Sequence, residues 1–398
     1  MIYLHLDHYS TIVQTFDIAG LVTLALGDHH SLILAQDGSV WSTAVNFRGH
    51  DLNRFGKHFI QVIPRHVMAT AAGGAHSIVI KQDNSVWAMG RNQQGQLGDG
   101  TTIRRRAFSY IQAIIGAKAV AAGGVHSMVL TEQGRVFVTG CNYNGQLGDG
   151  STSQRVKFRE VIASGVEAVA AGDSHSIVLK IDGSIWATGR NYNGQLGDGS
   201  KADRSKFVEV IHNGALDIAA GNSHSMVLMQ DGSVWATGWN RYGQLGDGSK
   251  TDKINFVQVV SDEAKAIATG GRHSLVLTQD GSVWATGHND FGQLGFGLAT
   301  VSNNFVRVLL GDVAAIAAGD SHSMVVKQDD SIWASGYNGF GQLGDRSTIS
   351  QRNFTRVAPF GNGARHSTII CTWNHIAESS ITQAYRAVFL HFTWRFSC

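Results

Sequence analysis

The sequence contains little proline, cysteine or charge. Only 2 prolines and 3 cysteines occur among 398 residues, and 16% of the residues are charged. Three cysteines are too few for a disulfide framework, and none of their spacings is that of zinc ligands, so we expect a reducing compartment. The formal net charge of +2 is too small to indicate nucleic-acid binding by itself.

Long apolar runs are also missing. No segment approaches the length needed to span a membrane, and the start "MIYLHLDHYSTIV" has no basic region followed by a long apolar core. We therefore expect a soluble cytoplasmic or nuclear protein without a membrane span. Glycine, in contrast, is abundant, with 48 residues. This composition is typical of short strands joined by tight turns.

A His-Ser pair recurs at intervals of about 49 residues. The seven histidines are His30, His76, His126, His175, His224, His273 and His322. Each copy contains four short apolar segments of the types "AIAAG", "HSMVL", "SVWATG" and "NFVQVV". Four strands in a repeat of this length are typical of a propeller blade. The sequence thus predicts an all-β fold, a seven-bladed β-propeller of four-stranded antiparallel blades.

Two further columns of the repeat support this fold. The turn between the second and third strands is predicted to be a two-residue hairpin of type I′, which requires positive φ at its second position. That position is occupied by Gly38, Asn84, Gly134, Gly183, Gly232, Gly281 and Asp330. One large aromatic residue follows each turn and is expected to pack between blades. These residues are Trp41, Trp87, Phe137, Trp186, Trp235, Trp284 and Trp333.

The motifs "GGxHS", "DGSVWATGxN" and "GQLGDG" resemble the repeat of the regulator of chromosome condensation family across residues 18–357. The resemblance implies a seven-bladed propeller. It also implies the activities of the founding branch, which exchanges nucleotide on the GTPase Ran and binds chromatin. That branch uses an insertion in one blade and a basic N-terminal tail. Here the constant spacing leaves no room for a long insertion, and the N-terminus is not basic.

The plant ultraviolet-B photoreceptor has the same fold and uses a Gly-Trp-Arg-His-Thr type motif. This chain has "GGRHS" at 270–274, with Gly271 at the Trp position, so light sensing is not favoured.

The termini are predicted to lie outside the repeats. Residues 1–17 are predicted to be an N-terminal segment. Within it, "TIVQTF" at 11–16 resembles a fourth strand that would close the ring, although residues 18–357 already supply seven blades. Residues 358–398 are interpreted as a degenerate repeat remnant and a short tail. Apolar residues at helical spacing in 376–396 predict an amphipathic helix, for which packing on the disc is favoured over docking or membrane contact.

The repeated polar residues are expected to be structural. A His at the same place in every blade is better explained by an imidazole that hydrogen-bonds backbone groups beside the central channel than by metal binding or catalysis. The adjacent Ser lacks a nucleophile elbow and a repeated acid. The "GQLGDG" segments lack the Gly-Lys-Ser/Thr ending of a phosphate-binding loop, so they are interpreted as turns with a buried Leu. We expect no catalytic residue, metal or cofactor, and no enzymatic activity.

Recognition must then depend on residues that differ between blades. The loop before each His and the long loop after each third strand are expected on one face of the disc. Arg, Tyr and Trp on these loops are the types enriched in interface hot spots. The predicted partner-binding residues are Arg91, Tyr143, Arg190, Tyr192, Trp239, Arg241, Arg272, His288, Phe291, Tyr337, Asp173 and Asp320.

Basic residues farther along the long loops, from the run at 104–106 to Arg352, add charge to the rim and fit an acidic partner better than DNA. The first blade departs most from the repeat, with "NFRGHDLNRFGKH" at 46–58. That segment is either a drifted end blade, which is slightly favoured, or a specialised contact sector.

The sequence predicts a monomeric protein-interaction platform that binds a protein partner through the long-loop face. The alternative is guanine nucleotide exchange on a small Ran-like GTPase. Chromatin is a weaker candidate partner, because the charge is low and the N-terminus is not basic.

Overall fold

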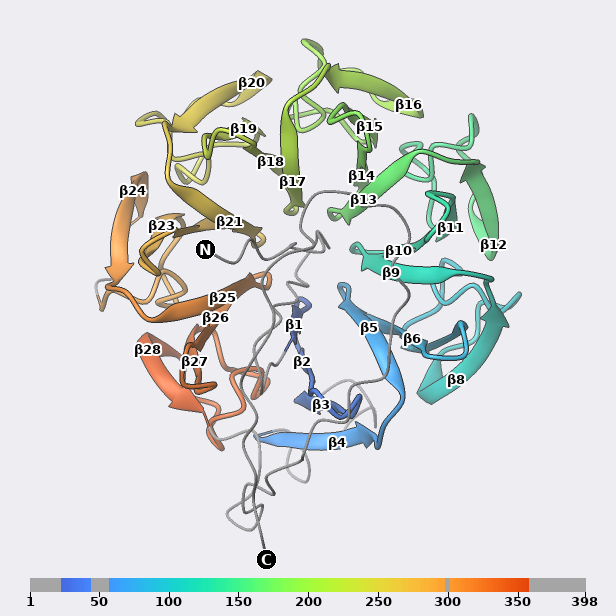
Figure 1. Ribbon diagram of the computed structural model, residues 1–398, viewed down its shortest axis with the longest axis horizontal. Coiled ribbons are helices and arrows are strands. Elements are labelled where there is room, and N and C mark those ends of the chain that lie inside the picture. Colours follow the sequence, from blue (N-terminus) through green and yellow to red (C-terminus); the bar gives the residue numbers. More distant parts are fainter. Residues whose placement is uncertain (1–22, 44–56, 298–300, 358–398) are drawn as a thin grey trace, which may run out of the picture. The chain divides into compact units, whose positions relative to one another are not determined.

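The computed structural model describes residues 23–43, 57–297 and 301–357. In this part of the chain, seven four-stranded antiparallel sheets follow one another around a central channel (Figure 1). The predicted seven-bladed propeller is confirmed, and the described residues contain no helix. The suggested clasp strand at 11–16, most of the divergent first-blade loop and the helix at 376–396 lie outside these residues.

Each blade contains four consecutive strands, ordered from the channel to the rim (Figure 1). Blades 1 and 2 consist of β1 (Thr23–Leu26), β2 (Ser31–Leu34), β3 (Val40–Thr43), β4 (Phe59–Ile63), β5 (Val67–Ala72), β6 (His76–Lys81), β7 (Ser85–Gly90) and β8 (Arg105–Ala113). Blades 3 and 4 consist of β9 (Ala117–Ala122), β10 (His126–Thr131), β11 (Val136–Gly140), β12 (Arg155–Ile162), β13 (Val166–Ala171), β14 (His175–Lys180), β15 (Ile185–Gly189) and β16 (Arg204–Ile211).

Blades 5 to 7 repeat this order. They consist of β17 (Ala215–Ala220), β18 (His224–Met229), β19 (Val234–Gly238), β20 (Lys253–Val260), β21 (Ala264–Thr269), β22 (His273–Thr278), β23 (Val283–Gly287), β24 (Ser302–Leu309), β25 (Val313–Ala318), β26 (His322–Lys327), β27 (Ile332–Gly336) and β28 (Gln351–Val357). The last blade therefore takes all four strands from consecutive sequence, and β28 supplies the fourth strand.

The core lies between neighbouring blades. Ile177 and Leu179 of blade 4 pack with Ile218 and Val227 of blade 5 in one buried cluster. The inner strands are buried on both faces, which explains their continuous apolar runs, whereas the outer strand β16 contains only half-buried and exposed positions. The aromatic column is confirmed as packing between blades, since the half-buried Trp186 contacts the cluster shared by blades 3 and 4.

The turns between the second and third strands differ from the predicted type I′ hairpin. Gly183 has φ +79°, but no positive φ is found at Asp182. The Gly183 amide donates to the Lys180 carbonyl, and the Lys180 amide donates to the Ser184 carbonyl, both at 2.9 Å. This is a type I turn followed by a glycine bulge, which needs positive φ at one residue only. The preference for Gly, Asn or Asp in this column was therefore correct, but the turn type was wrong.

The repeated His and Ser side chains connect the blades in a closed ring. Each His Nε2 lies 2.7–3.0 Å from the Ser Oγ of the next blade, and His322 of blade 7 meets Ser31 of blade 1 at 2.9 Å. Ser225 Oγ also donates to the Gln195 carbonyl at 2.7 Å, so it accepts its bond from the His175 N–H. The histidines therefore have a structural role, as the repetition predicted, but the partner of each Nε2 is a Ser hydroxyl of the next blade and not the expected backbone group.

Candidate partner-binding face

The two sets of loops form one face of the disc, as expected. In blades 2 to 7, the backbone amide directly after the third strand donates to the carbonyl of the residue before the His of the same blade. This bond joins Trp239 to Ser223 at 2.8 Å and Tyr337 to Ser321 at 2.8 Å. Residues of the long loops and of the loops before the histidines therefore lie side by side around the channel.

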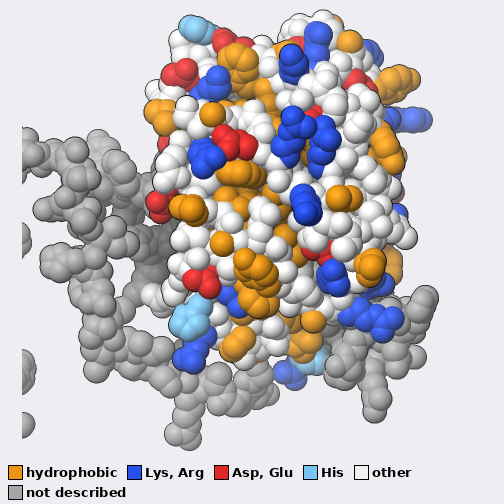
Figure 2. All heavy atoms as spheres, turned by 90° about the vertical axis from the view of Figure 1, so that its right-hand side faces the viewer, with side chains coloured by type: hydrophobic (Ala, Val, Ile, Leu, Met, Phe, Trp, Pro, Cys, Tyr) orange, Lys and Arg blue, Asp and Glu red, His pale blue; other side chains and the backbone are white. Residues whose placement is uncertain are grey.

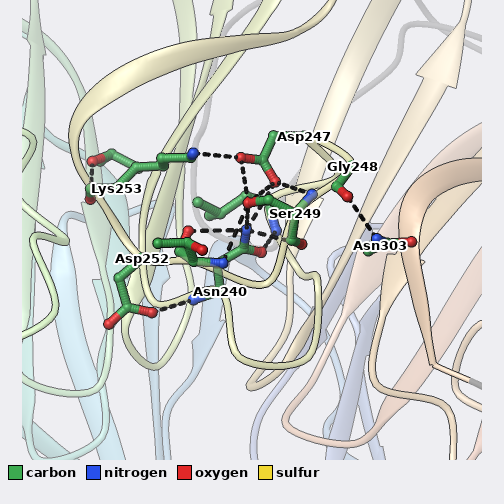
Figure 3. Close-up of polar contacts among 10 residues, drawn as sticks. Asn240, Asp247, Gly248, Ser249, Asp252, Lys253 and Asn303 are labelled. Atoms are coloured by element: carbon green, nitrogen blue, oxygen red, sulfur yellow. Dashed lines mark hydrogen bonds and ion pairs between the residues drawn. The ribbon is translucent and has the colours of Figure 1, made fainter.

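A buried Asn shapes the long loop in each of blades 2 to 7, as Figure 3 shows for blade 5. Asn240 Oδ1 accepts the Leu245 amide at 3.0 Å, and its Nδ2 donates to Asp247 Oδ1 at 2.8 Å and to the Ser249 carbonyl at 3.2 Å. The corresponding Leu–Asn bond occurs at Asn92, Asn142, Asn191, Asn289 and Asn338. The Leu245 amide is thus used within the loop, and Leu245 is fully buried. This agrees with the interpretation of "GQLGDG" as a turn.

We call the hydrogen bonds that repeat in these loops, among them those of the Asn, Leu and Asp residues, the framework. Some of the basic rim residues belong to it. Arg105, Arg155, Arg204 and Lys253 form ion pairs with the Asp of their own blade's loop at 2.5–3.0 Å. Burial opposes ionisation of Asp198, but hydrogen bonds from Arg204 and Ser200 lower its pKa. On the rim near β8 and β12, blue Lys and Arg side chains are interspersed with acidic and apolar ones (Figure 2). This side of the rim therefore does not present a field of one sign.

Seven rings form a continuous series on the other half of the face. We call it the aromatic arc, and it runs in order through Trp239, Tyr242, His288, Phe291, Tyr337, Phe340 and His29. Consecutive ring centroids are 4.6–6.3 Å apart, and most pairs are edge-to-face or tilted. These distances are those of favourable aromatic pairs. The arc crosses blades 5, 6 and 7 and reaches blade 1.

Two polar residues contact the first three rings of the arc, Trp239, Tyr242 and His288. The Arg272 guanidinium lies over the Trp239 and Tyr242 rings, 5.7 and 5.4 Å from their centroids. Gln293 Nε2 donates to His288 Nδ1 at 2.9 Å, so the other ring nitrogen of His288 donates to Asp290 Oδ2, also at 2.9 Å. The sequence-predicted residues Trp239, Arg272, His288, Phe291 and Tyr337 are therefore brought together.

The other predicted residues do not join this arc. Tyr143 and Tyr192 are 63% and 70% exposed, and within the described ranges neither ring contacts another aromatic ring. Arg91, Arg190 and Arg241 are exposed on blades 2, 4 and 5, where Arg91 Nε donates to Gln93 at 2.9 Å. They share the face but form separate features.

Three carboxylates surround the mouth of the channel. Asp28, Asp173 and Asp320 each come directly after a glycine that follows the first strand of the blade, and Asn222 donates to Asp320 Oδ1 at 2.8 Å. Burial, followed by the charges of Asp320 and Asp173, raises the pKa of Asp28 to about 7. The channel here holds only about 40 Å³, far below the volume of a small-molecule site. Within the described part of the chain no His, Cys, Asp and Glu group could hold a metal ion.

Sequence reasoning missed Tyr242, Phe340 and His29 as members of the arc. Tyr242 and Phe340 occupy the fourth position after the glycine that ends the third strand, where blades 2 to 4 have Gln94, Asn144 and Asn193. A comparison of this column would have found both. Gly339 was missed as well. A Cβ at this residue would collide with the Tyr337 hydroxyl, so Gly339 leaves room for that ring.

Solved structures support the fold. Human WBSCR16 is 22% identical, covers 77% of this chain and 85% of its own, and has a TM-score of 0.70. Yeast RCC1 (Prp20), solved bound to Kap60, is 18% identical, with 90% and 89% covered and a TM-score of 0.72. A second structure, Prp20p from Saccharomyces cerevisiae, described with its binding properties to Gsp1p and histones, is 19% identical, with 88% of each chain covered and a TM-score of 0.72.

The comparison with curated proteins found no match. No helix among the described residues is long and apolar enough to cross a membrane.

The comparisons with family models agree with the repeat. The model of the RCC1-like domain matches residues 8–261, and models of the regulator of chromosome condensation (RCC1) repeat match residues 264–293, 313–342 and 280–326. The chain therefore belongs to the family of RCC1-like propellers built from regulator of chromosome condensation repeats.

Proposed function

We propose that this protein is an interaction platform that binds a protein partner through the aromatic arc. The observation that supports this most is the continuity of the seven rings across four blades, whereas Tyr143 and Tyr192 on the other loops of the face contact no other aromatic ring of the described residues. Large aromatic and Arg side chains supply most of the binding energy in protein interfaces. An RCC1-type interaction role is the general function of this fold family, and the arc is our choice of surface.

The arc is also held in place before a partner arrives. Buried Asn240 fixes the loop that carries Tyr242, and Gln293 fixes the orientation of His288. Side chains that are already ordered lose less conformational entropy on binding than flexible ones do. A rigid aromatic surface therefore favours tight association with a protein.

The test compares two triple variants of the full chain. Trp239→Ala, Phe291→Ala and Tyr337→Ala together remove rings from the arc, whereas Arg91→Ala, Tyr143→Ala and Tyr192→Ala remove the same number of large side chains from the other sector. Partners are identified by affinity purification, and their affinity is then measured by calorimetry with purified proteins. We expect at least a 100-fold loss for the first variant and less than a 3-fold loss for the second. Equal losses would contradict the proposal.

A second candidate is guanine nucleotide exchange on a small GTPase. The founding branch of the family acts on the GTPase Ran, and the Prp20p structure of the same fold is described with its binding to Gsp1p and histones. The assay is the release of labelled GDP from a panel of purified small GTPases. Acceleration of release would support the exchange activity, and no acceleration with any of them would leave the platform function alone. Histones belong in the same binding panel as candidate partners.

A further inference from the structure

We infer that the part of the aromatic arc from Phe291 to Phe340, beside the channel mouth, binds an Arg or Lys side chain of an extended cationic segment in the protein partner. This inference rests on the proposed function, because it specifies the chemistry of the partner. The binding residues would be the carboxylates of Asp28 and Asp320 together with the rings of Phe291, Tyr337 and Phe340.

The backbone places these carboxylates at the inner edge of the arc. His29 directly follows Asp28, and its ring packs on Phe340 with centroids 4.6 Å apart. Ser321 directly follows Asp320, and its carbonyl accepts the Tyr337 amide at 2.8 Å. Both acidic residues are therefore next in sequence to a residue that contacts the arc.

Among the described residues, the three carboxylates at the mouth have no cationic partner in an ion pair. No ion pair within the described ranges involves Asp28, Asp173 or Asp320. Asp320 accepts hydrogen bonds from Asn222 and Ser321, and Asp173 accepts one from Ser174, but these donors are neutral. Burial, and after it repulsion from Asp320 and Asp173, raises the pKa of Asp28 to about 7. A cation placed here would relieve that repulsion, whereas an acidic partner would increase it.

The arc itself already holds one cation. Arg272 lies over Trp239 and Tyr242 and occupies that end of the arc. Phe291, in the middle of the arc, remains 39% exposed, and no charged side chain of the described residues lies over its ring. Guanidinium groups stack on aromatic faces while donating to carboxylates, so an incoming Arg can satisfy rings and acids together.

The dimensions of the mouth favour a side chain over a free ligand. Its volume of about 40 Å³ is too small for a metabolite, and the described acidic groups do not form a metal site. The cation must then arrive on a larger molecule that remains on the face. An extended peptide segment lying along the arc meets this requirement.

The test measures a defined peptide on the full chain. The probe is a fluorescein-labelled Gly-Arg-Gly-Arg-Gly-Arg-Gly peptide, and its twin carries citrulline in place of Arg, which removes the charge and keeps the shape. Fluorescence anisotropy at low ionic strength should show binding of the Arg peptide and at least 10-fold weaker binding of the citrulline peptide. Equal affinity for the two peptides, or no binding of the Arg peptide, would overturn the inference.

Matched variants locate the site. Asp28→Asn with Asp320→Asn, and separately Phe291→Ala with Phe340→Ala, should each weaken the Arg peptide at least 10-fold. The control, Glu132→Gln with Asp262→Asn, removes the same charge from exposed positions beside the turns of the opposite face and should change affinity less than 2-fold. Equal effects of the mouth and control variants would overturn the inference.

Partner binding separates this inference from the proposed function. If the variant lacking three arc rings loses the partner while Asp28→Asn with Asp320→Asn keeps full affinity for it, only the cationic chemistry fails. A photo-crosslinker at position 291 reports the occupant directly. Crosslinks to Arg or Lys segments of the partner would support the inference, and crosslinks to residues 358–398 of the same chain would overturn it.

Discussion

The two halves of the long-loop face have the same framework and different surfaces. In blades 2 to 4 the first and fourth positions after the third strand hold Arg91 and Gln94, Cys141 and Asn144, and Arg190 and Asn193, which we call the polar sector. In blades 5 to 7 the same positions hold Trp239 and Tyr242, His288 and Phe291, and Tyr337 and Phe340. The framework contacts the first of these positions through its backbone amide, so the side chain there is free to differ.

This comparison separates stability from recognition. Damage to the framework should affect both sectors equally, because the bonds repeat from blade to blade. Changes of the surface side chains should affect binding in one sector only. Large losses of stability are therefore expected from changes of the framework, and small ones from exchanges of surface side chains.

The largest effect is expected on acidification. The seven repeated histidines each bond the Ser of the next blade, and burial lowers the pKa of six of them from 6.5 to about 3 and that of the seventh, His30, to about 4. Below pH 6.5 these imidazoles are protonated in the unfolded chain but stay neutral in the folded chain. The free energy of unfolding therefore falls as the pH decreases towards 4. Burial also raises the pKa of Asp28 and Asp217 to about 7, which offsets two of the seven protons. The net slope is about 7 kcal/mol per pH unit.

Urea melts followed by circular dichroism between pH 7.5 and 4.5 measure this slope. A typical stability of about 5–15 kcal/mol would be lost within one or two pH units. Both sectors should unfold in one transition, because the ring joins every blade to the next. His224→Gln should reduce the slope by one proton, about 1.4 kcal/mol per pH unit. Stability that is constant between pH 7 and 5 would show that the imidazoles are not held neutral.

The second prediction concerns the buried Asn of each sector. Asn191→Ala in blade 4 and Asn240→Ala in blade 5 should each lower the free energy of unfolding by about 2–4 kcal/mol, because the buried Leu amide loses its acceptor. The two losses should agree within about 1 kcal/mol. Chemical denaturation gives both values, and Arg190→Ala, an exposed neighbour, serves as the control with a change below about 0.5 kcal/mol. A loss confined to one sector would contradict a shared framework.

Much of the fold could be predicted because the repeat samples each position seven times. The columns of His, Ser, Trp and Gly showed which residues were structural, and the strand lengths followed from their apolar runs. The turn type was wrong because a Gly with positive φ fits both a type I′ turn and a type I turn with a bulge. The sequence does not contain the φ of the preceding Asp that distinguishes them.

The site was harder to predict because it depends on contacts between blades. Trp239 and Phe291 were recognisable as unusual in their columns, but the sequence could not show that Tyr242 links Trp239 to His288. Nor could it show that Arg105 and Lys253 are held by loop aspartates and so add little free charge to the rim. Pairing across blades is a property of the ring, and it has no signature within one repeat.

The third prediction compares the same inner-strand position in the two sectors. Asp217 on β17 stands where blade 4 has Ala168, and burial raises its pKa to about 7. A group whose folded pKa is raised destabilises the fold as pH rises from 3.8 to 7. Asp217→Ala should therefore increase stability by about 1–3 kcal/mol at pH 8 and by less at pH 5. Chemical denaturation at both values measures this, and Ala168→Asp should have the opposite effect. A gain independent of pH would contradict burial of the charge.

The smallest effect on stability is expected when surface pairs are exchanged between sectors. Arg190→Trp with Asn193→Tyr gives blade 4 the pair of blade 5 and should change the free energy of unfolding by less than about 0.5 kcal/mol, because neither side chain belongs to the framework. The reverse exchange, Trp239→Arg with Tyr242→Asn, removes ring contacts at 5.4 and 4.8 Å and should cost about 1 kcal/mol. Thermal melts give both changes. A cost above about 2 kcal/mol for the first exchange would mean that the polar sector also supports the fold, and the two halves would then differ in more than their surfaces.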